Sequence, residues 1–273
     1  MIFLNCFFCI ADLSNLVTQV DEDGNQINSG PPAESEASSA GSSSKPSSSL
    51  CACVIRTLCC INFDDVYNRE PLPPLLTEQK PSSKGKKCLV LDLDETLVHS
   101  SFVEVPEADF KIDVTLDGRT FIIYVVKRPG VEEFLKDLAE HYEIVLFTAS
   151  VEKYAQKVTE LIDPKATIDA MLFREHCTFH QGNYVKDLAR LNRDLTQCII
   201  VDNSEISFQF QPENGIGIGS FLTNKGDREL YYCRDFLLQI KDSVDVRKDL
   251  QNYPSFVESR FQQDYAYRLN HRI

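Results

Sequence analysis

The sequence has no tryptophan, only two methionines and few basic residues. Lys and Arg total 28 against 41 Asp and Glu, which gives a formal net charge of −13. An acidic chain repels the phosphate backbone of DNA and RNA, so direct nucleic-acid binding is disfavoured. The chain also lacks an apolar run of the roughly 20 residues needed to span a bilayer. Hydrophobic residues nevertheless make up 43%, so we expect a folded, soluble domain.

The amino-terminal part differs in composition from the rest. Residues 29–49 are almost wholly Ser, Ala, Gly, Pro and Glu, and residues 71–87 contain several Pro, Ser and Lys residues that are typical of a linker. Such segments bury too little apolar surface to offset the entropy of ordering them. We therefore predict a flexible tail over residues 1–83, a folded domain over 84–250 and a carboxy-terminal extension over 251–273.

Six of the ten cysteines lie in the predicted tail, at positions 6, 9, 51, 53, 59 and 60. No histidine stands near them, which disfavours a zinc site. Their apolar neighbours suit reversible S-acylation, and this predicts peripheral membrane contact; reduced thiols without lipid are the alternative. We find no secretory signal, so the expected location is the nucleus or cytoplasm, with a membrane-associated pool.

Three short, wholly apolar runs each end at a polar residue: 88–91 before Asp92, 144–147 before Thr148, and 198–201 before Asp202. Continuous apolar runs are typical of strands buried on both faces of a parallel sheet. Helical periodicity lies between or after them, over 131–138, 151–162 and about 228–241. The order predicts an α/β fold with a doubly wound, mostly parallel sheet. Because ligands bind beyond the carboxyl ends of such strands, the three polar residues are expected to share one rim.

One segment alternates apolar and polar residues. Positions 112–116 and 121–125 flank Asp117-Gly118, which predicts an antiparallel β-hairpin with a type I′ turn. The hairpin is inserted after the first predicted strand, so we expect it beside the rim. The alternative is a hairpin at the sheet edge that contacts no ligand.

Asp92 and Asp94 place two carboxyl groups at the end of the first predicted strand. A carboxylate that attacks phosphorus forms an acyl phosphate and divides hydrolysis into two steps, while a second carboxyl group protonates the leaving oxygen and later activates water. We assign the attack to Asp92 and the proton transfer to Asp94.

Carboxylates and phosphate repel each other, so this chemistry needs cations. Oxygen ligands select Mg²⁺, and Asp202 and Asn203 supply further oxygens. Thr148 can hydrogen-bond the transferred phosphoryl group, and Lys186 is expected to balance its charge. Each feature alone has a structural explanation as a cap, a turn or a solvated charge, but their joint order is that of a haloacid-dehalogenase-type phosphatase.

Six segments together resemble the small phosphatases of the RNA polymerase II carboxy-terminal domain: residues 92–102, 127–129, 146–150, 172–175, 182–188 and 202–204. The resemblance implies a haloacid-dehalogenase-like fold, with Asp92 as the phosphorylated nucleophile and Asp94 as acid and base. It also implies that magnesium is held by the Asp92 side chain, the Asp94 carbonyl and Asn203, with Asp202 close by, and that Thr148 and Lys186 contact phosphate.

The same resemblance implies an apolar substrate pocket made by five residues, Phe102, Val114, Leu116, Ile123 and Val151. Arg174 falls where that family has an arginine near the substrate. The chain departs from the family at Glu205, where proline is common, and at Phe221-Leu222, where Trp-Phe is common.

No large lid fits between Asp92 and Thr148, so an open rim is expected, which suits a phosphopeptide better than a small metabolite. We expect a protein serine/threonine phosphatase, and the resemblance implies the RNA polymerase II carboxy-terminal domain, or similar Pro-containing phosphopeptides, as substrate. A small-molecule phosphatase and a catalytically silent scaffold on the same fold are the alternatives.

Overall fold

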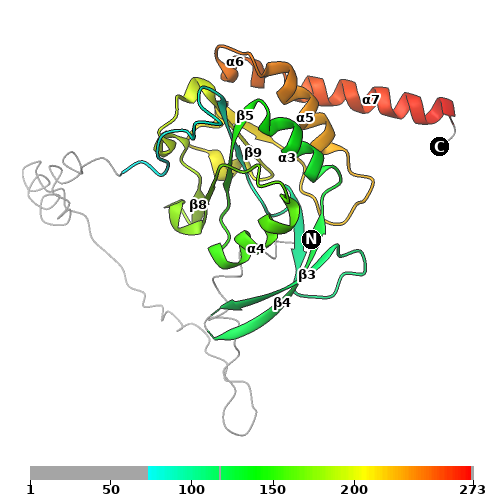
Figure 1. Ribbon diagram of the computed structural model, residues 1–273. Helices are drawn as coiled ribbons and strands as arrows, with labels where there is room; N and C mark the ends of the chain where they lie inside the picture. The colour runs from blue at the N-terminus through cyan, green and yellow to red at the C-terminus, as the bar shows by residue number, and fades with distance from the viewer. Residues whose placement is uncertain (1–72, 117, 272–273) are drawn as a thin grey trace, which may run out of the picture. The chain divides into compact units, whose positions relative to one another are not determined.

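Five parallel strands form the central sheet, in the order β10-β9-β1-β5-β6. The computed structural model describes residues 73–116 and 118–271, without the side chains of 267–271 (Figure 1). The strands are β1 (Lys87–Leu91), β5 (Tyr142–Phe147), β6 (Ala170–Leu172), β9 (Cys198–Asp202) and β10 (Gly215–Gly217). The chain moves outward from β1 to β5 and β6 and then returns to β9 on the other side of β1. This reversal confirms the doubly wound α/β fold.

The three predicted helices form close to their expected bounds, as α3 (Val131–Ala139), α4 (Glu152–Ile162) and α5 (Glu229–Ile240). Figure 1 shows α3 beside α5. Alternate residues of the central strands, among them Val90 and Ile200, enter a core cluster with Leu188 from the loop region after β8. Since neighbouring strand residues point to opposite faces, both faces of the sheet are covered, as the continuous apolar runs require.

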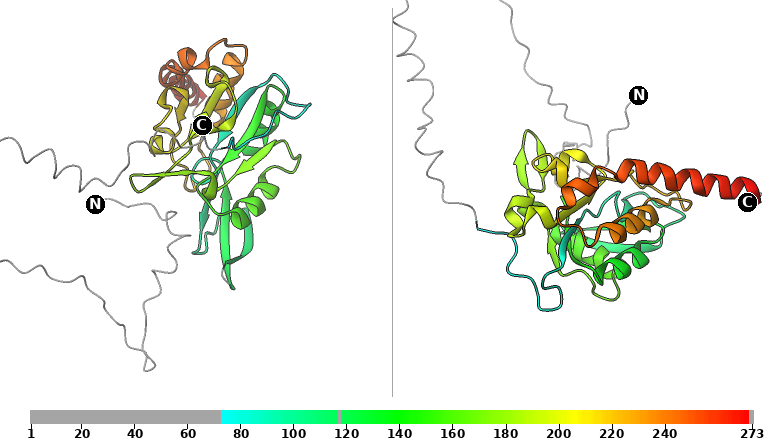
Figure 2. Two further views of the ribbon diagram at one scale, coloured as in Figure 1. Left: turned by 90° about the vertical axis from the view of Figure 1, so that its left-hand side faces the viewer. Right: turned by 90° about the horizontal axis from the view of Figure 1, so that it is seen from above.

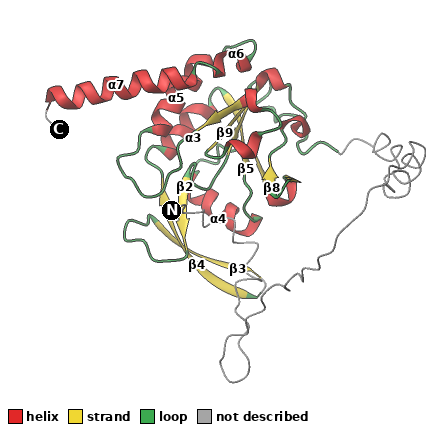
Figure 3. Cartoon of the chain, turned by 180° about the vertical axis from the view of Figure 1, so that it is seen from behind, coloured by secondary structure: helices red, strands yellow, loops and turns green. Residues whose placement is uncertain are grey.

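The predicted hairpin is present and is larger than expected. Strands β3 (Phe110–Leu116) and β4 (Arg119–Lys127) pair antiparallel, and β2 (Val98–Ser101) joins β4 to give a three-stranded sheet in the order β2-β4-β3 (Figure 3). Gly118 has a φ of 77°, which a type I′ turn needs. Strand β2 has four residues of mixed polarity, too few to show a period of two.

The folded unit begins at Pro73, eleven positions before the start predicted from composition at residue 84. The backbone N–H of Leu75 donates to the carbonyl of Arg190 at 2.8 Å. Leu76 is 8% exposed and belongs to the core cluster. One buried leucine among prolines gives no periodic signal. The tail and its cysteines up to residue 72 lie outside the described residues.

The carboxy-terminal part continues the fold with α6 (Val246–Leu250) and α7 (Tyr253–His271). The Tyr253 ring packs on Phe236 of α5, with ring centroids 5.2 Å apart, and α7 then runs away from the sheet (Figure 2). The remaining elements are the two-stranded β7 (Thr178–His180) and β8 (Asn183–Val185), and 3-10 helices at 174–176, 188–191, 195–197, 205–208 and 212–214. Within the described ranges, no helix is long and apolar enough to cross a membrane.

Candidate active site

Asp92, Lys186 and Asp202 meet at the carboxyl ends of β1 and β9. The Lys186 Nζ lies 2.5 Å from Oδ1 of Asp92 and 2.6 Å from Oδ2 of Asp202, and all three side chains are buried. Burial by itself lowers the pKa of Lys186, but the two carboxylates outweigh it and raise that pKa above its ordinary value. The lysine therefore stays charged, and the sheet brings together three residues predicted from the sequence.

Asp94 is buried on the same rim and has two hydroxyl partners. Ser150 donates to its Oδ2 at 2.6 Å, and Tyr154 of α4 donates to its Oδ1 at 2.5 Å. Burial, assisted by the charges of Glu95 and Asp92, raises the pKa of Asp94 to about 7, although the two hydroxyl groups act in the opposite direction. A carboxyl group with this pKa can give and accept a proton near neutral pH, which suits an acid and base.

A tight turn follows Asp94 and places Thr96 within hydrogen-bond distance of Asn203. Glu95 adopts a left-handed φ of 57°, a conformation that costs a residue with a side chain some energy and often occurs at functional sites. The turn brings Thr96 to Asn203, whose backbone N–H donates to Thr96 Oγ1 at 3.2 Å. The Thr96 hydroxyl in turn lies 3.3 Å from the Asn203 side-chain oxygen. Asn203 is thus held next to the aspartates.

Thr148 lies at the rim directly after β5, and Arg174 lies there shortly after β6. Thr148 is buried directly after β5, and its Oγ1 accepts the backbone N–H of Ser150, which leaves its own hydroxyl proton for another acceptor. The Arg174 Nε donates to the carbonyl of Ala149 at 2.6 Å. Both residues therefore lie at the rim, and their contacts with phosphate or substrate stay a prediction.

The five residues of the predicted apolar pocket separate into two groups. Val114 and Ile123 are fully buried, so they support the insertion rather than line an open surface. Phe102 is 40% exposed, and its ring lies 6.0 Å from Phe121. Leu116 and Val151 are half-buried. Only Phe102, Leu116 and Val151 therefore present surface that a ligand can reach.

The donor set fits a magnesium ion better than a softer metal. Two carboxylates, of Asp92 and Asp202, converge on one lysine nitrogen, and the amide oxygen of Asn203 is held beside them. Mg²⁺ is commonly bound by one or two carboxylates together with water and substrate phosphate. Among the described residues no group of three or more His, Cys, Asp or Glu side chains forms a metal cluster, so a zinc-type cage is not found there.

Several residues that organise the site were not predicted. Tyr154 fits the apolar face of its helix, and the signal for its role is that a buried tyrosine hydroxyl needs a partner. Arg128 is buried and stabilises the turn that contains Thr96, because its Nη1 donates to the carbonyl of Thr96 at 3.1 Å. Its Nε and Nη2 pair with Asp227 at 2.9 and 3.0 Å, across 99 sequence positions, so no local pattern reveals the pair.

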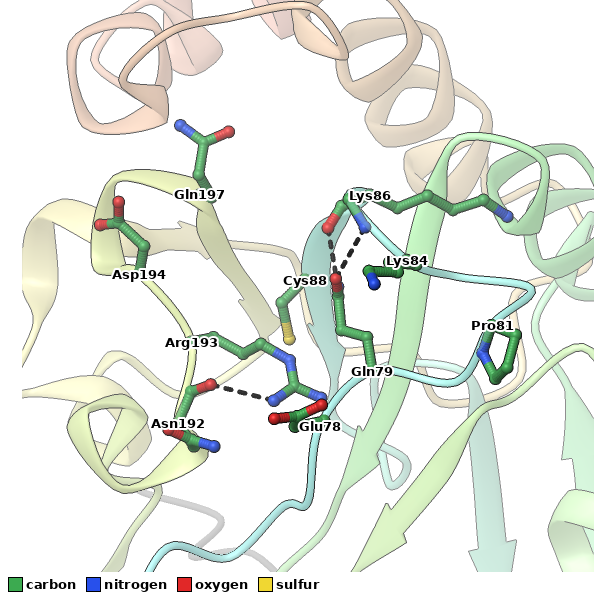
Figure 4. A pocket seen from close by; sticks show the side chains of 11 residues that line it. Glu78, Gln79, Pro81, Lys84, Lys86, Cys88, Asn192, Arg193, Asp194 and Gln197 are labelled. Carbon is green, nitrogen blue, oxygen red and sulfur yellow. Dashed lines mark hydrogen bonds between the residues drawn. The ribbon is translucent and has the colours of Figure 1, made fainter.

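A separate hollow lies at the amino ends of β1 and β9, away from the rim (Figure 4). Its walls are the 78–86 segment and the loop 192–197, and Cys88 borders it. The Arg193 side chain in this hollow already pairs with Glu143 at 2.6 Å. None of the predicted site residues lines it, and its contacts fasten the amino-terminal segment to the sheet.

Comparison with known proteins gives a family match and several relatives. Residues 87–247 match the family model described as NLI interacting factor-like phosphatase. The chain is 48% identical over 181 residues to the carboxy-terminal domain RNA polymerase II polypeptide A small phosphatase 1 of Homo sapiens. This match covers 66% of this chain and 69% of that protein. It is 52% identical over 164 residues to CTD small phosphatase-like protein 1 of Caenorhabditis elegans.

The match to the nematode protein covers 60% of this chain but only 33% of that relative. A solved structure of Fcp1, described as an essential RNA polymerase II CTD phosphatase, is similar with a TM-score of 0.48 and 20% identity, over 57% of this chain and 62% of that chain. All six sequence segments that carry the resemblance lie within residues 87–247, which the family model matches.

Proposed function

The chain belongs to the NLI interacting factor-like phosphatase family, and we propose that it is a magnesium-dependent protein serine/threonine phosphatase. Its substrates are phosphoserine in the RNA polymerase II carboxy-terminal domain or in similar Pro-containing peptides. The observation that carries the proposal is the convergence of Asp92, Asp94 and Lys186 on one rim. The names of the human and nematode relatives support the substrate class.

In the proposed reaction, the Asp92 carboxylate attacks phosphorus and the bond to the serine oxygen breaks. Asp94 gives its proton to the departing oxygen, and the phosphoryl group is left on Asp92. Asp94 then removes a proton from water, which attacks the aspartyl phosphate and releases inorganic phosphate. The Lys186 ammonium and the Thr148 hydroxyl stabilise the negative charge on the phosphoryl oxygens.

Magnesium, when bound, neutralises charge between phosphate and carboxylates. Asp92, Asn203 and the Asp94 carbonyl would hold it, with Asp202 close by. Lys186 bridges the two side-chain carboxylates, which supports a site built for a highly charged ligand.

The insertion supports a peptide substrate. Phe102 and Leu116 on the insertion, with Val151 before α4, are reachable apolar surface, which suits one proline or aliphatic side chain next to the phosphorylated residue. We further propose a nuclear or cytoplasmic location, with a membrane-associated pool through acylated cysteines before residue 72.

The test compares a phosphoserine peptide, a sugar phosphate and p-nitrophenyl phosphate at equal concentration. We expect the peptide to be hydrolysed with the higher kcat/KM of the two biological substrates, and all turnover to cease in Asp92→Asn and with EDTA. Preferred hydrolysis of the sugar phosphate would instead establish a small-molecule phosphatase. Absence of turnover on all three substrates would establish the silent scaffold.

A further inference from the structure

Three side chains form a row that leads outward from the rim. The Arg174 guanidinium lies over the Tyr184 ring, 5.2 Å from its centroid. Tyr184 in turn contacts the ring of Phe179, which is its direct partner in the β7–β8 pairing, with centroids 5.3 Å apart. Phe179 is 66% exposed. We call these residues the Arg174–Tyr184–Phe179 row.

The row is continuous with the candidate phosphoryl site. Arg174 donates to the carbonyl of Ala149, which follows Thr148 directly. Tyr184 lies in β8, which ends one residue before Lys186. The inner end of the row therefore touches the rim, and its outer end is a solvent-exposed ring.

The row also carries charge that suits a phosphopeptide. The Arg174 Nη1 is buried and has no hydrogen-bond partner among the residues that the structure describes. A buried donor without a partner is costly, and a carbonyl or anionic oxygen of a ligand would satisfy it. The charge of Lys186 is already matched by Asp92 and Asp202, so Arg174 supplies the further positive charge at this end of the row.

We propose that the Arg174–Tyr184–Phe179 row is a second peptide-binding surface, which receives a planar ring of the phosphoprotein substrate two residues from the phosphorylated one. This inference rests on the proposed function. An extended peptide rises about 3.3 Å per residue and presents every second side chain on the same side. When the phosphate of such a peptide reaches Lys186, its second neighbour lies on the same side of the peptide as the phosphate, and the proposal places that neighbour on Tyr184 and Phe179. Aromatic rings pack on such rings edge-to-face or offset, and proline can pack on the same surface.

Phe179 and Tyr184 of the row lie on β7 and β8, and Arg174 lies in the 3-10 helix before them, whereas the apolar surface of Phe102 and Leu116 lies on the insertion. The two surfaces therefore make separable contributions to specificity. The insertion surface receives a residue on one side of the phosphoserine, and the Arg174–Tyr184–Phe179 row receives a residue on the other side.

The experiment uses the full chain and phosphoserine peptides that carry Phe or Ala two residues before or two residues after the phosphoserine. We expect the wild type to hydrolyse the Phe peptide of one of these pairs with a kcat/KM about three- to tenfold higher than its Ala counterpart. Phe179→Ala removes this preference, and Phe179→Tyr retains it. Each rate is divided by the rate on p-nitrophenyl phosphate, which has no second neighbour.

Phe261→Ala is the matched control, because Phe261 is a similarly exposed phenylalanine on α7. This variant is expected to keep the wild-type preference. Equal preference in wild type and Phe179→Ala, or no preference at either position, overturns the proposal for the row. If the wild type does not hydrolyse p-nitrophenyl phosphate, the proposed function itself is refuted, so the two failures are distinguishable.

Discussion

Lys186 and Asp92 are 94 positions apart in the sequence, yet the lysine Nζ lies 2.5 Å from the aspartate Oδ1 inside the domain. The contact exists because β1 and β9 are neighbours and the segment after β8 returns to their carboxyl ends. A buried cation between two carboxylates ties the stability of the domain to the charge balance of its candidate site.

Lys186→Met keeps most of the side-chain volume and removes the charge. Because it leaves two buried carboxylates without their cation, we expect a loss of about 3–5 kcal/mol in the free energy of unfolding. The loss of phosphoryl stabilisation is expected to lower kcat at least about 100-fold. Denaturant titration and steady-state kinetics measure the two effects.

The control for that variant is Lys225→Met. Lys225 pairs with Asp109 at 2.9 Å but is 46% exposed, so its removal is expected to cost about 1 kcal/mol or less. If both lysine variants had equal stability, the buried ion pair would not be the source of the effect.

Asp94→Asn tests the role of the second carboxyl group. An amide cannot protonate the leaving oxygen, so kcat/KM on a phosphoserine peptide, which reports the step that forms the aspartyl phosphate, is expected to fall about 10²- to 10⁴-fold. p-Nitrophenol leaves as a stable anion and needs little protonation, so the loss of kcat/KM on p-nitrophenyl phosphate is expected to be much smaller. An equal loss of kcat/KM on both substrates would show that Asp94 does not act as the acid.

Glu143 predicts a pH-dependent contribution to stability. Burial acts to raise the pKa of Glu143, but hydrogen bonds from Arg193 and Gln79 outweigh it and lower that pKa below the ordinary 4.5. The unfolded chain then binds the proton more readily, so the contribution is fully present above about pH 4.5 and is lost as pH falls through the folded-state pKa.

Glu143→Gln is therefore expected to be about 1–3 kcal/mol less stable than the wild type at pH 7, with the difference shrinking below pH 4.5. Denaturant titrations between pH 7 and pH 3.5 measure it. A difference that grows as the pH falls would contradict the assigned sign.

The amino-terminal boundary gives a further prediction. Leu76 is buried in the core cluster, so Leu76→Ala is expected to cost about 2–5 kcal/mol, and a chain that starts at residue 84 to lose at least as much. Val244→Ala is the control because Val244 is 88% exposed. Unchanged stability of the chain starting at residue 84 would restore the boundary predicted from composition.

The sequence predicts the rim well because its signals are local. Each apolar run ends at a polar residue, so Asp92, Thr148 and Asp202 could be placed on one edge before any coordinates were known. Lys186 could be predicted from the charge that phosphoryl transfer requires and from the motif around it.

The supporting contacts could not be predicted because they depend on distant parts of the chain. The Tyr154 hydroxyl reaches Asp94 from a helix whose pattern indicates only a buried face. Asp227 meets Arg128 across the fold, and Leu76 fills a gap in the core from a proline-rich segment. Val114 and Ile123 alternate correctly, but periodicity does not show that the insertion buries them completely.

The most direct measurement is the covalent state of Asp92 during turnover. Protein quenched in acid after mixing with ³²P-labelled phosphopeptide is expected to carry a hydroxylamine-labile label on the peptide that contains residue 92, and Asp92→Asn to carry none. Turnover without any such label in rapidly quenched wild-type samples would contradict the aspartyl-phosphate mechanism.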